Sequence, residues 1–87
     1  MHYRIELKPS AARQLEKLPK AVQIKIGPRI DALSENPRPH GVEKLAGAED
    51  YFRIRVGDYR VIYQVQDRWL LILVVRLGHR REIYRGF

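Results

Sequence analysis

The chain contains no cysteine, and its three histidines are scattered without the spacing of metal ligands. These features exclude disulfides, thiolate zinc sites and cysteine nucleophiles, and we expect neither a metal nor a cofactor. The sequence also has no run of 18 apolar residues, and its first ten residues lack the apolar core of a signal peptide. It therefore predicts neither a membrane span nor secretion, and we expect a cytoplasmic protein.

The length of 87 residues is sufficient for one modest hydrophobic core and too small for a two-domain enzyme with a cofactor cleft. Hydrophobic residues make up 45% of the chain and charged residues 31%, a balance typical of folded soluble proteins. We expect residues 1–87 to form a single domain.

Lysine and arginine outnumber aspartate and glutamate by 17 to 10, and the net charge of +7 favours a polyanionic partner. Residues 1–50 hold nine basic and seven acidic groups, a net +2, whereas residues 51–87 hold eight and three, a net +5. All eight basic groups of the second part are arginines. Because the arginine fork matches phosphate oxygens, this part suits nucleic acid, although a solvated basic surface is the plainer alternative.

Hydrophobic periodicity predicts an α+β domain of the order β-α-α-β-β-β. We expect a two-helix hairpin packed on one face of a small, mainly antiparallel four-stranded sheet. The first strand should pair with the most apolar one, since that strand needs neighbours on both sides. The expected elements are a strand at residues 3–7, a helix capped by Ser10, a helix over residues 20–36, a loop over 36–50, and strands at 51–56, 59–66 and 69–77.

A two-residue turn at Gly57-Asp58 would fix the register of one hairpin, with Arg55 opposite Arg60. Alternation then places Arg53, Arg55 and Arg60 on one face and the apolar residues on the other. Like charges on neighbouring strands repel, so something must compensate, and a bound anion would do so. Alternatively, the side chains splay apart into water.

The segment after the last strand carries further polar groups. If it folds back over the arginine face, His79, Arg80 and Tyr84 arrive beside Arg55 and Arg60. Spacing alone leaves His79 equally well explained as a strand-end residue and Tyr84 as an aromatic anchor.

Three ordered motifs carry a family resemblance: K-L-x-G at 44–47, Y-R-V-x-Y at 59–63 and G-x-R-x-E-x-Y at 78–84. With the element order, they make the chain similar to the RelE branch of the RelE/ParE toxins of toxin-antitoxin pairs. The resemblance implies a toxin that enters the ribosomal A site and cleaves mRNA there. It also implies a cognate antitoxin and contact with operator DNA only through the joint complex. We expect no membrane partner, because the sequence has no long apolar run.

The resemblance further implies roles for single residues, and a reaction in which the RNA 2′-hydroxyl attacks the adjacent phosphorus without a metal. A guanidinium stays protonated, so arginines at the first positions cannot accept a proton as lysines could. Acid-base work would then fall to Tyr84 or His79. The implied phosphate-binding residues are Arg53, Arg55 and Arg81, and the implied catalytic residues are Arg60, Arg80, Tyr84 and His79.

Two other functions stay open on the sequence. The first is the ParE branch, in which the same scaffold inhibits DNA gyrase without being an enzyme. The second is a non-catalytic binding module whose basic face only recruits a partner.

Overall fold

The structure is a computed structural model of the 87-residue chain, and it describes residues 2–47 and 49–80. Within these residues, no helix is long and apolar enough to cross a membrane. The elements are β1 (Arg4–Leu7), α1 (Pro9–Glu16), α2 (Lys20–Ala32), β2 (Glu43–Lys44), β3 (Tyr51–Val56), β4 (Tyr59–Gln66), the 3-10 turn η1 (Asp67–Trp69) and β5 (Leu71–His79).

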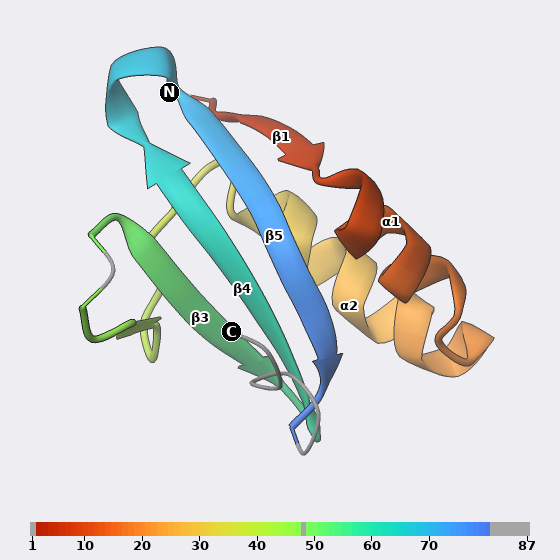
Figure 1. The fold of residues 1–87 in the computed structure, drawn as a ribbon. Coiled ribbons are helices and arrows are strands. Elements are labelled where there is room, and N and C mark those ends of the chain that lie inside the picture. Colours follow the sequence, from red (N-terminus) through yellow and green to blue (C-terminus); the bar gives the residue numbers. More distant parts are fainter. Residues whose placement is uncertain (1, 48, 81–87) are drawn as a thin grey trace.

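One mixed sheet has the strand order β1-β5-β4-β3-β2 (Figure 1). β1 runs parallel to β5, from Arg4 beside Leu71 to Leu7 beside Val74, and the other pairs are antiparallel. The expected class and the expected partner of the first strand are confirmed. The expected count of four strands is wrong, because the two residues of β2 add a fifth strand from within the predicted loop.

The first helix begins earlier than expected. Ser10 is not its cap, since Lys8 is the N-cap residue and Pro9 occupies the first turn. Proline fits there because the first helical N–H groups have no partner inside the helix. In α2, Pro19 is instead the N-cap residue, and this helix ends at Ala32 rather than near residue 36.

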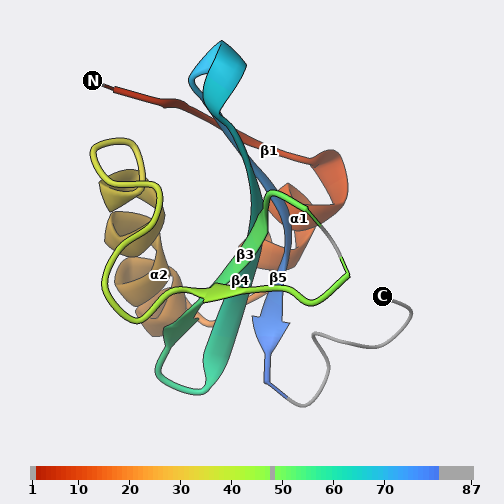
Figure 2. The same cartoon turned by 90° about the vertical axis from the view of Figure 1, so that its left-hand side faces the viewer.

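The core lies between the helices and one face of the sheet, and Figure 2 shows α2 on that side. Ile26, Ile30 and Leu33 recur at helical spacing and are buried against the inward residues of the strands. β4 therefore turns an apolar face toward the helices. The buried strand residues of this core are Phe52, Ile54, Val56, Val61, Tyr63, Val65, Ile72, Val74 and Leu77.

Tyr63 ties the loop before β2 to the centre of the core. Its side chain is fully buried, stacks on Phe52 with ring centroids 6.0 Å apart, and donates a hydrogen bond of 2.7 Å to the Pro37 carbonyl. Burial raises the pKa of the Tyr63 phenol to about 12. The hydroxyl therefore stays protonated and keeps the loop in place at neutral pH.

Candidate functional site

The β3–β4 hairpin brings three arginines to the face of the sheet away from the core. Gly57 has a φ of +62°, which a turn with glycine first requires. As expected, Arg55 lies opposite Arg60, and alternation places Arg53 on their side. Ile54 lies between Arg53 and Arg55 along β3, points to the helix side of the sheet and belongs to the buried core.

The residue after β5, Arg80, is a fourth arginine, and it lies at the turn end of this hairpin. Gly78 pairs with Arg60, and the backbone N–H of Arg80 donates a hydrogen bond of 2.8 Å to the Asp58 carbonyl. Burial is the largest cause that lowers the pKa of Arg60, and the charges of Arg55, Arg53 and Arg80 lower it further. The structure therefore brings together Arg53, Arg55, Arg60 and Arg80, here called the arginine cluster.

The strand β2 supplies a carboxylate to the arginine cluster. Glu43 pairs with Arg53, whose Nη2 donates a hydrogen bond of 2.7 Å to Glu43 Oε2. Arg53, and then Arg60 and Arg55, lower the pKa of Glu43, so that it is ionised at neutral pH. An acidic side chain of the protein itself thus offsets part of the repulsion for which we expected a bound anion.

A β-bulge brings a further arginine to the same face. Register shifts between Ile62 and Tyr63, and on the bulged side Ile62 pairs with Arg76. Because Ile62 also pairs with Arg53, one row of side chains crosses four strands, from Glu43 through Arg53 and Ile62 to Arg76. Ile62 is fully buried within this row and outside the main core.

His79 lies beside the arginine cluster rather than within it. It pairs with Tyr59, the residue before Arg60, and its ring meets the Tyr59 ring edge-on with centroids 5.6 Å apart. Tyr59 packs against the core, so the register turns His79 toward the helix side. Two other residues implied by the resemblance, Arg81 and Tyr84, lie outside the described residues.

Sequence reasoning missed Glu43 and could not place Arg76. Both depend on pairing details that periodicity does not carry: a two-residue strand in one case and a bulge in the other. A signal for Glu43 exists in retrospect, because it immediately precedes the K-L-x-G motif that resembles the family pattern.

The arginine cluster is suited to binding phosphate groups. Guanidinium groups donate paired hydrogen bonds to phosphate oxygens, and rigid strands hold several of them in one place. Among residues 2–47 and 49–80, no group of three or more histidine or acidic side chains is placed to hold a metal ion.

We expect Glu43→Gln to bind single-stranded RNA about 2- to 5-fold more tightly at low salt, the size of effect typical of an exposed ion pair. The variant adds one unit of positive charge and releases Arg53 from its carboxylate partner. Fluorescence anisotropy with a labelled oligonucleotide measures the change. Glu6→Gln is the matched control, since Glu6 pairs with Arg4 on β1. Equal tightening in both variants would mean that only net charge matters.

Comparison with known proteins gives consistent results. Residues 5–84 match the family described as "ParE toxin of type II toxin-antitoxin system, parDE". A "Putative RelE-like toxin protein" of Escherichia coli is 33% identical over 84 residues, which cover 94% of this chain and 87% of that protein. The "mRNA interferase toxin RelE" of Escherichia coli K12 is 28% identical, covering 97% of this chain and 92% of that protein.

A solved structure shares the whole fold. In the crystal structure of the archaeal RelE-RelB complex from Pyrococcus horikoshii OT3, the matching chain superposes with a TM-score of 0.82 at 34% sequence identity. The match covers 94% of this chain and 99% of that one.

Proposed function

Because this chain belongs to the RelE/ParE toxin superfamily, on its RelE-like side, we propose that it is a toxin that cleaves mRNA in the ribosomal A site. The observation that carries this proposal is the convergence of Arg53, Arg55, Arg60 and Arg80 on one face. A relative that covers most of the chain bears the name mRNA interferase, which supports RNA as the substrate.

The reaction that we propose needs no group beyond the RNA and the protein. The 2′-oxygen forms a bond to the adjacent phosphorus, and the bond from phosphorus to the 5′-oxygen breaks. The products are a 2′,3′-cyclic phosphate and a free 5′-hydroxyl. One proton leaves the 2′-hydroxyl and one reaches the 5′-oxygen, so the protein must align the chain, neutralise charge and move protons.

Arg60 and Arg80 are our candidates for stabilising the transition state. Negative charge grows on the phosphorane oxygens as the new bond forms, and guanidinium groups already in place stabilise this charge more than the ground state. Arg53 and Arg55, with Arg81, would hold neighbouring phosphates. Glu43 positions Arg53 through their ion pair.

Proton transfer is assigned to Tyr84, with His79 as the second candidate. Positive charge nearby lowers the pKa of a phenol and makes it a better proton acceptor at neutral pH. Tyr84 is preferred because the ring of His79 lies against Tyr59 on the helix side of the sheet. General acid-base help of this kind contributes about 10² to 10⁴ in rate.

A cognate antitoxin is the proposed protein partner. The archaeal relative was solved as a RelE-RelB complex, and a basic face of this kind attracts an acidic, amphipathic segment that folds as it docks. Contact with operator DNA would then occur only through the joint complex.

Binding of RNA to the arginine cluster should weaken steeply with salt. Each phosphate neutralised on a single strand contributes about −0.7 to the slope of log K against log salt, so four contacts give about −3. Filter binding between about 50 and 200 mM salt measures this value. Arg55→Ala should reduce the magnitude of the slope by about 0.7. A flat response would show that the arginines do not bind phosphate.

Expression in bacteria separates the proposal from the gyrase-inhibitor alternative. We expect amino-acid incorporation to stop while plasmid supercoiling is unchanged. Loss of supercoiling with continued translation would instead place the protein, in function, with the ParE toxins whose family description it matches.

A further inference from the structure

A second surface feature lies at the opposite end of β4 from the arginine cluster. There η1 joins β4 to β5 and carries Trp69, the single tryptophan of the chain, whose exposed fraction is 65%. Leu70 follows in a left-handed conformation with a φ of 48°, which sets the end of this turn. The flat face of this ring is therefore accessible at a defined turn, and such a ring can stack on a base.

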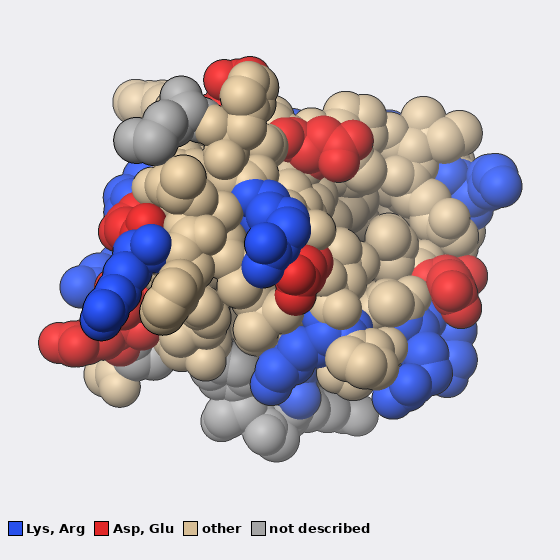
Figure 3. Space-filling model, turned by 90° about the horizontal axis from the view of Figure 1, so that it is seen from above, with Lys and Arg blue, Asp and Glu red and all other residues tan. Residues whose placement is uncertain are grey.

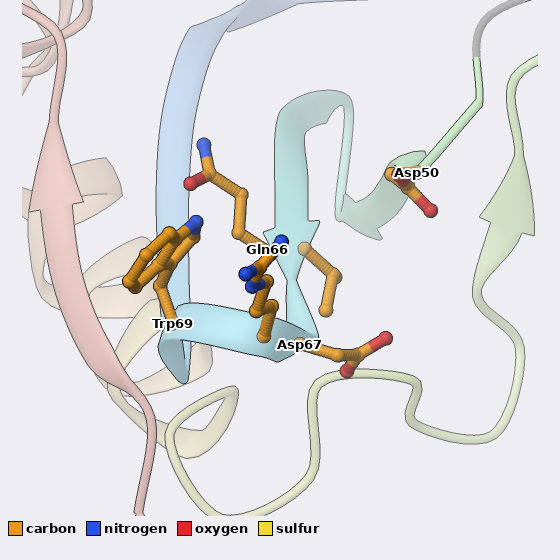
Figure 4. Close-up of a pocket in the computed structure, with 6 residues that line it drawn as sticks. Asp50, Gln66, Asp67 and Trp69 are labelled. Atoms are coloured by element: carbon orange, nitrogen blue, oxygen red, sulfur yellow. The ribbon is translucent and has the colours of Figure 1, made fainter.

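Trp69 borders an open pocket of about 400 Å³ (Figure 4). One wall is fixed by Asp67, which accepts hydrogen bonds from Arg38 at 2.7 and 3.3 Å and from the Tyr3 hydroxyl at 2.6 Å. Arg38 and Tyr3 also lower the pKa of Asp67, which keeps it ionised and held. The residues that line the pocket are Asp50, Val65, Gln66, Asp67, Arg68 and Trp69.

The chemistry of the pocket combines a ring, a cation and hydrogen-bonding groups. The Arg68 guanidinium lies over the Trp69 ring, 5.3 Å from its centroid, in a cation–π contact. Gln66, on the same side of β4 as Trp69, adds an amide whose nitrogen donates a hydrogen bond of 2.8 Å to Gln64 and whose oxygen can accept from the amino and imino groups of bases, while Asp50 lines the far side of the pocket (Figure 4). Stacking on an aromatic ring beside an arginine is how proteins bind unpaired bases.

The surface around this end differs from the arginine cluster. Figure 3 shows basic and acidic side chains interspersed among mostly uncharged surface. Such a surface does not favour a contact made mainly through phosphates. It suits a contact made through a base, with one cation, Arg68, for the attached phosphate.

We propose that this pocket binds one unpaired RNA base, stacked on Trp69 with its hydrogen-bonding edge toward Gln66 (Figure 4). The inference rests on the proposed function, because it gives the same enzyme a second point of contact with RNA. From Arg60 to Gln66 the strand rises six residues, or about 20 Å, so the base belongs to a different nucleotide from the one cleaved. It comes either from the same mRNA or from ribosomal RNA.

Intrinsic fluorescence tests stacking without reference to cleavage, because Trp69 is the only tryptophan. The full chain carrying Arg60→Ala is titrated with RNA decamers of adenine or of uracil, and with a blunt RNA duplex. We expect strong quenching by the adenine decamer, weaker quenching by uracil and none by the duplex. No quenching by any RNA would overturn the proposal, as would quenching only by a partner protein.

Cleavage kinetics on programmed ribosomes give the second test. Trp69→Ala should raise KM about 5- to 150-fold, the fold-change that corresponds to losing one stacked base, with kcat unchanged. Trp69→Phe should recover most of the loss. Ile24→Ala is the matched control, since Ile24 is an equally exposed apolar residue, at 66%, on α2. Equal KM values for Trp69→Ala and Ile24→Ala would overturn the stacking site and leave the nuclease proposal standing.

An mRNA that ends at the A-site codon separates the two sources of the base. If the effect of Trp69→Ala disappears on this template, the base comes from downstream mRNA; if it persists, ribosomal RNA supplies it. Absence of cleavage by the unmodified protein would defeat the proposed function, and fluorescence alone would then decide whether the pocket binds a base.

Discussion

Arg60→Ala is expected to reduce the rate of mRNA cleavage by about 10² to 10³ and to abolish growth arrest, while the fold and antitoxin binding remain. The reason is geometric. Arg60 lies at the centre of the arginine cluster, where burial and three neighbouring guanidinium groups already lower its pKa. A guanidinium group held in place by a strand of the sheet stabilises an anionic transition state more than a mobile surface charge does.

Controls for this result come from the same chain. Arg80→Ala should behave like Arg60→Ala. Arg29→Ala removes the same charge from an exposed position on α2. It should leave the cleavage rate within about 2-fold, because an exposed charge away from the site acts only weakly. Arg60→Lys keeps the charge without the planar fork, and its cleavage rate should lie between those of Arg60→Ala and Arg29→Ala. Unchanged growth arrest with both Arg60→Ala and Arg80→Ala would remove the catalytic assignment.

Tyr63→Ala is expected to lower the free energy of unfolding by about 3 to 5 kcal/mol, which is close to the whole stability of many small domains. The substitution leaves a cavity beside Phe52 and frees the Pro37 carbonyl from its hydrogen bond. Urea denaturation followed by circular dichroism measures the change. Ile24→Ala, at an exposed position, should be nearly neutral, and an equally small effect of Tyr63→Ala would contradict the core described above.

The conservative variant Tyr63→Phe separates the hydroxyl from the ring and should cost about 0.5 to 1.5 kcal/mol. It also predicts a difference in pH dependence. The pKa of Tyr63 in the folded protein, about 12, lies above the ordinary value of 10.0. The stabilisation by the protonated hydroxyl is therefore complete below pH 10 and is lost as the pH rises toward 12. The stability of Tyr63→Phe should fall less over that range.

The hairpin of β3 and β4 could be predicted from the sequence because its determinants are local. A two-residue turn at Gly57-Asp58 fixes the register, and the register fixes which side chains share a face. The clustering of Arg53, Arg55 and Arg60 followed directly. The pairing of β1 with β5 was predictable for another reason, since the most apolar strand needs neighbours on both sides.

The rest of the site depends on contacts that leave no pattern in the sequence. β2 has two residues, both exposed, in a segment rich in proline and glycine, so hydrophobic periodicity did not identify Glu43 as a partner of Arg53. A bulge shifts the alternation of β5, which is why Arg76 had no predictable side. The placement of His79 beside Tyr59 followed from the same strand register.

Reconstituted translation with purified components, followed by mapping of mRNA ends, tests the central claim most directly. With ribosomes present, the protein should produce new mRNA ends at the A-site codon that carry a 2′,3′-cyclic phosphate, and Arg60→Ala should produce almost none. Intact mRNA in the presence of the unmodified protein, or equal cleavage by Arg60→Ala, would contradict a nuclease built on the arginine cluster.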